Sequence, residues 1–100
     1  MGSAVDLLHE ARAKERAACI PEAIQCYEGA ISAAERTGEQ AILAEALRRL
    51  AIVLHYRNES ARAHELCNRS YKVACGLGND VLAAEALNTM GGLALRTGAL

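Results

Sequence analysis

Apolar residues recur every three or four positions along most of the chain, with charged residues between them. That spacing places the apolar side chains on one face of an α-helix, so it predicts amphipathic helices. Glycine, proline and short polar clusters interrupt the pattern and divide it into five segments. We expect helices over about residues 4–18, 21–37, 39–56, 61–76 and 80–97.

Residues with known capping preferences mark the ends of these helices. Ser3 suits the N-cap of the first helix, and Gly38 suits a left-handed C-cap after the second. Ser60 is expected to cap the fourth helix, and either Asn79 or Asp80 to cap the fifth. The turns between helices are therefore short, which predicts antiparallel neighbours.

A stretch of four residues, Ala-Glu-Ala-Leu, occurs at 44–47 and again at 84–87, which is 40 residues later. Other residues match at the same offset without a gap, and a fixed period of this size is typical of stacked repeats. Equivalent residues such as Leu47 and Leu87 should then have similar surroundings. We expect one domain, 1–100, containing a first repeat (about 4–43), a second (about 44–83) and the first helix of an incomplete third (about 84–100).

The last predicted helix has an apolar face but no second helix of its own repeat after it. We expect its inward face to comprise Val81, Ala84, Leu87, Met90, Gly91 and Ala94. The missing mate suggests the N-terminal part of a longer array. Side chains that this would leave partly uncovered are Val81, Met90, Leu93 and Leu95. An uncovered apolar face favours self-association, so we expect at least partial dimerisation.

Composition narrows the possible classes of protein. Hydrophobic residues make up 52% of the chain but aromatic residues only 3%, which favours helices packed through small side chains over a sheet. The net charge of −1 argues against direct binding of nucleic acid or an anionic membrane, although residues 44–83 carry six basic and four acidic side chains. Without a signal peptide, a long apolar run or a C-x-x-C motif, the chain is expected to be cytoplasmic, with reduced cysteines.

Two sets of residues carry a family resemblance. The first helix of the second repeat has large and small residues at a characteristic spacing, namely Leu47, Leu50, Ala51 and Leu54. The second helix of the first repeat has Ala23, Tyr27 and Ala30. This pattern resembles the tetratricopeptide repeat in a form of about 40 residues, and it is similar to the repeats of kinesin light chains and of bacterial signalling and transcription regulators. The resemblance implies an all-α fold of antiparallel helix-turn-helix repeats, stacked as a short right-handed α-solenoid of about five helices.

The resemblance also implies where a partner would bind. In this family the first helices of successive repeats line a concave groove that holds peptides or protein elements, without catalysis or a cofactor. Carried over to this chain, the groove residues are Leu8, Arg12, Glu15, Arg16, Arg48, Arg49, Ile52, His55, Tyr56, Asn88, Gly92 and Leu95. Arginines on this face can form bidentate contacts with a partner's carboxylates, whereas the alternative is a merely solvated helix face.

The family's clamp for a C-terminal carboxylate does not match this chain. Its positions correspond here to Leu8, Arg12, Arg49, Glu85 and Thr89. Binding of chaperone C-terminal tails is therefore not expected.

Catalytic and metal-binding motifs are absent from the sequence. His64 and Cys67 are three residues apart on one predicted helix, but a closed zinc site requires four ligands. No nucleophile elbow, phosphate loop or metalloprotease helix occurs. We therefore expect no enzyme activity, no metal and no cofactor, and the sequence favours a protein-interaction scaffold. The alternatives are a regulatory arm of a larger bacterial signalling or transcription regulator, and a fragment that acts through self-association.

Overall fold

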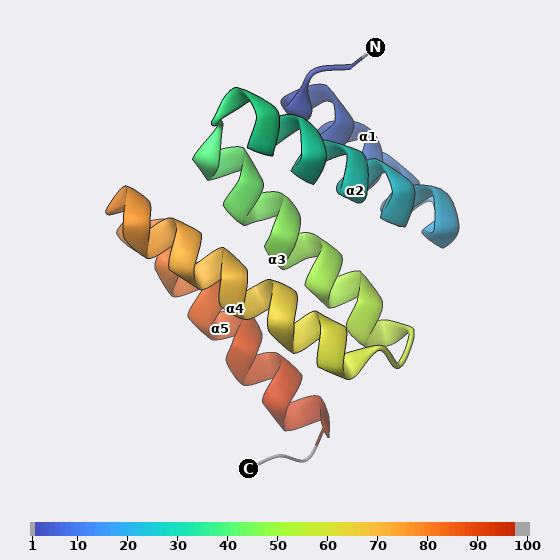
Figure 1. Ribbon diagram of the computed structural model, residues 1–100. Helices are drawn as coiled ribbons and strands as arrows, with labels where there is room; N and C mark the ends of the chain where they lie inside the picture. Colours follow the sequence, from blue (N-terminus) through green and yellow to red (C-terminus); the bar gives the residue numbers. More distant parts are fainter. Residues whose placement is uncertain (1, 98–100) are drawn as a thin grey trace.

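The secondary structure of the described residues consists of five helices and no strands (Figure 1). The computed structural model describes residues 2–97, and the side chains of residues 2–94. The helices are α1 (Ala4–Arg16), α2 (Ile20–Thr37), α3 (Gln40–Tyr56), α4 (Ser60–Leu77) and α5 (Asp80–Thr97). The all-α prediction is confirmed.

Four helix ends share one backbone conformation and recur at intervals of 40 residues. Ala18 and Asn58 follow α1 and α3 with φ of 61° and 67°, and Gly38 and Gly78 follow α2 and α4 with φ of 74° and 70°. In each case the next residue donates its N–H to the carbonyl five positions earlier, as in a Schellman motif. Because Ala18 adopts the left-handed conformation, α1 ends at Arg16, and the predicted end at residue 18 was too late.

Two of the expected N-caps form, and one does not. The Ser3 hydroxyl accepts the N–H of Asp6 at 3.2 Å, and the Asn79 side chain accepts the N–H of Leu82 at 3.0 Å. The prediction for Ser60 was wrong, because that residue is already the first of α4. Its hydroxyl lies instead 3.4 Å from Nδ1 of His55, at the end of α3.

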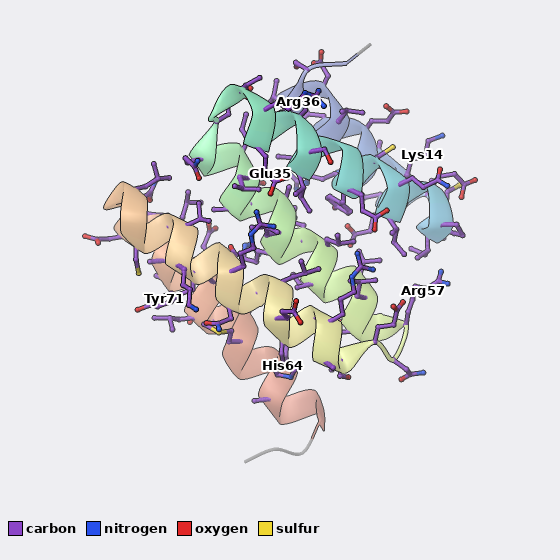
Figure 2. The ribbon with its side chains drawn as sticks, in the orientation of Figure 1. Lys14, Glu35, Arg36, Arg57, His64 and Tyr71 are labelled. Atoms are coloured by element: carbon purple, nitrogen blue, oxygen red, sulfur yellow. The ribbon has the colours of Figure 1, made fainter. Side chains whose placement is uncertain are left out.

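Each helix packs against its neighbours in sequence, and α3 also touches both α1 and α5. In Figure 1, α1 lies behind α2 and α5 lies behind α4, with α3 between the two pairs. Two ion pairs join α2 to α4, namely Arg62 with Glu28 at 2.9 Å and Arg69 with Glu35, which is labelled in Figure 2. One layer therefore contains α1, α3 and α5, and the other contains α2 and α4. The whole measures 42 × 33 × 18 Å.

The core is built around α3, which is covered on two sides by α2 and α4. Its largest buried side chains are Leu47, Leu50 and Leu54, each of which stabilises the fold by about 1.5–3 kcal/mol relative to an exposed side chain. Tyr27 of α2 is also fully buried, and its hydroxyl donates a hydrogen bond of 2.5 Å to Oε1 of Glu15. Burial, followed by this bond to Glu15, raises the pKa of Tyr27 well above its usual range.

The predicted inward face of α5 was largely wrong. Val81 and Leu87 are 71% and 51% exposed, and Ala84 and Gly91 are exposed as well. The buried face of α5 instead carries Ala86 and Leu93, with Leu82, Ala83, Thr89, Met90 and Ala94 half-buried. The reason is that α5 packs against α3 and α4 alone among the described helices. Of the side chains expected to be uncovered, Val81 is exposed and Met90 half-buried, Leu93 is buried, and that of Leu95 lies outside the described residues.

Candidate functional site

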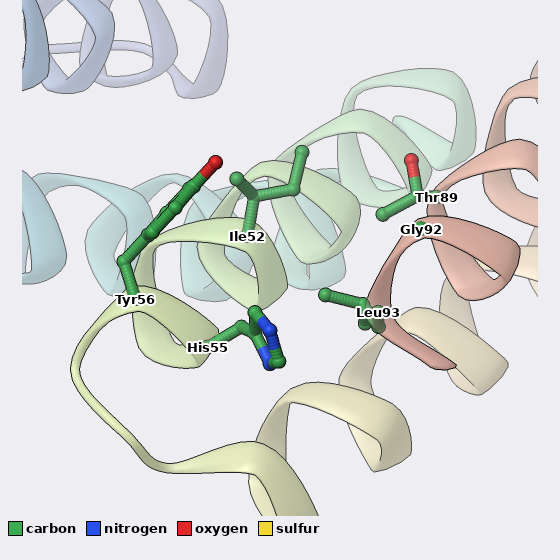
Figure 3. Close-up of a pocket in the computed structure, with 6 residues that line it drawn as sticks. All are labelled: Ile52, His55, Tyr56, Thr89, Gly92 and Leu93. Atoms are coloured by element: carbon green, nitrogen blue, oxygen red, sulfur yellow. The ribbon is translucent and has the colours of Figure 1, made fainter. Parts of the chain in front are cut away.

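A pocket of about 200 Å³ lies between the C-terminal halves of α3 and α5 (Figure 3). Helix α3 contributes Ile52, His55 and Tyr56, and α5 contributes Thr89, Gly92 and Leu93. Four of these residues, namely Ile52, His55, Tyr56 and Gly92, were predicted from the sequence as groove residues. The structure therefore brings together residues from segments that are about 40 positions apart in the sequence.

The pocket is open on its α5 side because Gly92 has no side chain there. A methyl group at Gly92 would meet no heavy atom within 4 Å, so the space above this residue is open. Leu93 is buried and points from α5 toward His55 of α3 (Figure 3), and the half-buried Ile52 also lines the pocket from α3. Apolar side chains therefore form most of the wall, as in most sites that hold small molecules or side chains.

The open end of the pocket is aromatic. His55 and Tyr56 are adjacent on α3, with ring centroids 6.2 Å apart and an interplanar angle of 64°. Nδ1 of His55 lies 3.4 Å from the Ser60 hydroxyl, which orients the ring. Tyr56 is 61% exposed, whereas Tyr27 is fully buried. The chain has three tyrosines and no Phe or Trp, so Tyr56 is one of its few aromatic rings available to a partner. Rings of this kind supply contact area together with a polar group, and they are enriched at interfaces.

Two further hollows lie beside this pocket along α3. One, of about 310 Å³, lies on the other side of Tyr56 and is lined by Glu15, Ile20, Val53, Tyr56 and Arg57. The other, of about 350 Å³, lies between the N-terminal halves of α3 and α5 and is lined by Ala41, Ile42, Glu45, Asn79, Val81 and Leu82. The α3–α5 groove, defined here as this last hollow, the 200 Å³ pocket and the surface between them, thus follows most of α3.

The two adjacent arginines of α3 have different surroundings. Arg49 donates from Nε to Oε2 of Glu45 at 2.9 Å, and its charge also acts on Tyr27 on the α1–α2 side. Arg48, one position earlier, turns toward α4 and α5, and its Nε is buried without a hydrogen-bond partner among the described residues. The sequence grouped these two arginines, whereas the helix separates them by about 100° because each turn holds 3.6 residues.

The buried thiol of Cys67 indicates where the Arg48 charge lies. Cys67 belongs to α4, and its Sγ donates to the carbonyl of Ala86 in α5 at 3.5 Å. Burial raises the pKa of this thiol, and the positive charge of Arg48 opposes that rise. Arg48 is therefore close to the junction at which α3, α4 and α5 meet.

The remaining predicted groove residues are more dispersed. Leu8 is only 4% exposed and belongs to the core, so the prediction that it lines an open groove was wrong. Its position on α1 faces α2 and α3, which cover it. Arg12 and Glu15 are half-buried, whereas Arg16 and Asn88 are exposed. The side chain of Leu95 lies outside the described residues.

Sequence reasoning missed two residues of the pocket, Thr89 and Leu93. Thr89 was compared with a carboxylate clamp, and Leu93 was assigned to an uncovered face. The spacing along the helix could have identified Thr89, because it stands three positions before Gly92 and therefore lies on the same face of the helix. Thr89 donates its own hydroxyl to the carbonyl of Glu85 at 3.0 Å, which leaves its methyl group available to the pocket.

Neither a metal site nor a membrane span appears in the described part of the chain. Residues 2–94 contain no group of three or more His, Cys, Asp or Glu side chains that could hold a metal ion. No helix there is both long and apolar enough to cross a bilayer. Comparisons with protein-family models, with curated proteins and with solved structures found no match.

Proposed function

We propose that this chain is a cytoplasmic protein-interaction module that holds a peptide or protein element in the α3–α5 groove. The observation that carries the proposal is the 200 Å³ pocket, in which four residues predicted from the repeat pattern meet. Its wall is largely apolar and its open end carries the rings of His55 and Tyr56. These are properties of a site that binds a side chain of a partner.

The arrangement proposed for the helices is that of tetratricopeptide-type repeats in a short right-handed α-solenoid. Pairs α1–α2 and α3–α4 are joined by equivalent turns, and the left-handed residues at these turns recur every 40 positions. Contacts of α3 with both α1 and α5 support a layer of first helices. In such a layer the groove between successive first helices is where a partner would bind.

An extended peptide suits the dimensions of this groove. Residues 41–56 of α3 border the groove from end to end, which corresponds to roughly 22 Å of helix at 1.5 Å per residue. An extended chain covers that length with about seven residues. The two hollows at its ends would then receive side chains from opposite ends of the same peptide.

Filling the pocket tests the proposal. Gly92→Met places a flexible apolar side chain in open space within the pocket, whereas Gly91→Met, the matched control, places the same side chain at an exposed position about 100° around α5. A peptide selected from a random library on the wild-type chain should bind Gly92→Met at least about tenfold more weakly, a difference of about 1.4 kcal/mol. Fluorescence anisotropy measures this, with Gly91→Met retaining wild-type affinity. Selection that yields no binder, or binders indifferent to Gly92→Met, contradicts the proposal.

Self-association through α5 is a second candidate, favoured by the exposure of Val81 and Leu87. Leu87 is a large apolar side chain on the outer face of α5, where Ala84 and Gly91 would allow close approach of another helix, and Val81 is exposed at the start of the same helix. Sedimentation velocity at rising protein concentration should show a dimer that Leu87→Glu abolishes. Circular dichroism of Leu87→Glu should remain helical, since the position is solvent-exposed. A wild-type chain that stays monomeric at high micromolar concentration excludes this candidate.

A further inference from the structure

One side chain of the 200 Å³ pocket, His55, belongs to a residue type whose charge ordinarily changes near neutral pH. Its ring is half-buried and lines the pocket together with Ile52 and Leu93, and Leu93 points toward it (Figure 3). Histidine is the side chain that ordinarily gains or loses a proton between pH 5 and 8. The charge on an otherwise apolar wall therefore depends on a single proton.

The two ring nitrogens of His55 have different surroundings. Nδ1 lies 3.4 Å from the hydroxyl of Ser60, the first residue of α4. Nε2 has no hydrogen-bond partner among the described residues, and it retains surface that water can reach. A protonated ring donates from both nitrogens, so Nδ1 can then donate to Ser60 and Nε2 to water. The empty pocket can therefore hold this ring in either charge state.

An apolar side chain in the pocket would affect the two charge states differently. It would displace water from the ring of His55, and this loss of water costs the charged ring more than the neutral one. Occupancy of the pocket therefore favours neutral His55, and by linkage protonation of His55 disfavours occupancy. Binding is thus strongest above the titration range of His55 and weakens as the pH falls through that range.

We infer that His55 makes the pocket a pH-dependent site, which holds an apolar side chain while the imidazole is neutral and releases it when the imidazole is protonated. This inference rests on the proposed function and adds the regulation of the same site.

Other ionisable groups lie on the elements around His55. They are Arg48 and Arg57 at α3 and its end, Glu59 in the turn, His64 and the buried Cys67 on α4, and Glu85 on α5, one turn before Thr89; the side chain of Arg96 lies outside the described residues. Of this set, only His64 ordinarily titrates between pH 5 and 8. The fixed charges move the midpoint of the His55 titration without reversing the effect of occupancy, so the group to be separated from His55 is His64.

Gly92→Met tests the coupling without any ligand, because it places an apolar side chain permanently in the pocket. Nuclear magnetic resonance can follow the Cε1–H signals of the histidines while the pH is changed. The midpoint of the His55 titration should lie at lower pH in Gly92→Met than in the wild type, and that of the exposed His9 on α1 should not move. Gly91→Met, the matched control, should leave the His55 midpoint in place. A His55 midpoint that is unmoved or raised in Gly92→Met overturns the inference.

The pH dependence of peptide binding provides the second measurement. A peptide selected on the wild-type chain at about pH 7.5 should bind about three- to tenfold more weakly at about pH 5.5, which corresponds to a displacement of the titration by about half to one pH unit. His55→Gln should remove most of this difference. His64→Gln, the matched control, should retain it. Circular dichroism at both pH values establishes that the variants are folded.

The outcomes separate this inference from the proposed function. If Gly92→Met lowers the His55 midpoint but no peptide can be selected, the coupling between His55 and the pocket stands and the peptide groove is refuted. If a peptide is selected and binds equally at both pH values, the inference is refuted and the groove stands. The inference is also refuted if His64→Gln, and not His55→Gln, removes the pH dependence.

Discussion

Helices α3 and α5 contain the same four residues in the same register, yet these residues have different surroundings. Ala46 and Ala86 are both fully buried. Leu47, by contrast, has no exposed surface, whereas Leu87 is 51% exposed, so the prediction that these two leucines have similar surroundings was wrong. The second alanine of the repeated stretch is thus buried in both helices, whereas the leucine next to it is buried in α3 and half exposed in α5.

The difference arises from what covers each helix. The face of α3 that carries Leu47 is covered by α4, whose buried side chains on that side are small, namely Ala63, Cys67, Ser70 and Ala74. Among the described residues, no helix covers the equivalent face of α5. The face with Ala86 is covered in α5 because α3 and α4 pack against it. A repeated sequence therefore identifies equivalent positions, while burial depends on the elements packed around each copy.

Truncating the two leucines should show the largest contrast. Leu47→Ala removes a fully buried side chain and leaves a cavity, so the free energy of unfolding should fall by about 2–5 kcal/mol. Leu87→Ala should change it by less than about 0.5 kcal/mol, because the side chain is already half in water. Urea denaturation of the two variants measures both values. Equal losses would mean that α5 is covered in solution as α3 is, for example by a second copy.

Enlarging the shared alanine should reveal the similarity between the two helices. Ala46→Leu and Ala86→Leu both insert a large side chain into a filled space, and each should destabilise the chain by about 1–3 kcal/mol. Ala84→Leu, two positions earlier on the exposed face, is the control and should stay within about 0.5 kcal/mol of wild type. Thermal unfolding followed by circular dichroism provides the comparison. Tolerance of leucine at residue 86 alone would show that α5 is loosely docked.

Several helix ends could be predicted from the sequence, because they depend on interactions between neighbouring residues. Gly38 and Ser3 act as predicted because left-handed caps and hydroxyl N-caps are set by neighbouring backbone atoms. Ala18 defied prediction because alanine carries no signal for the left-handed conformation that it adopts. The face of α5 was mispredicted for a non-local reason, since Val81 and Leu87 would be inward only if another helix covered them.

The candidate site was predictable to the extent that it follows the repeat. Ile52, His55 and Gly92 were identified because, in the family that the sequence resembles, these positions of the first helices line one groove. Whether a given side chain on this surface forms a hydrogen bond within the chain could not be predicted from the sequence. Arg48 and Arg49 are identical neighbours, and only the positions of Glu45 and of α5 determine that one is bonded and the other is not.

Removing one hydroxyl tests whether α4 binds α3 through more than apolar contact. The buried Ser70 of α4 donates to the carbonyl of Ala44 at 2.6 Å, and Ala84, the equivalent residue in α5, has no such donor among the described residues. Ser70→Ala should lower the free energy of unfolding by about 0.5–1.5 kcal/mol, the usual net value of one hydrogen bond. Ser32→Ala, at an exposed position of α2, is the matched control. A neutral Ser70→Ala in urea denaturation would assign the α3–α4 contact to apolar packing alone.

The smallest expected effect is a gain in stability at the uncovered face of α5. Gly91 is exposed inside a helix, and a methyl group there would meet no heavy atom within 4 Å, whereas its equivalent in α3, Ala51, is fully buried. Gly91→Ala should therefore raise the free energy of unfolding by about 0.5–1 kcal/mol, because alanine loses less conformational entropy than glycine on forming a helix. Gly78→Ala introduces the same methyl group where φ is +70°, so it should destabilise the chain instead. Gly91→Ala could instead prove destabilising in urea denaturation while Gly78→Ala behaves as expected. That result would mean that the outer face of α5 is in close contact with another helix in solution, and that Gly91 is needed for this contact.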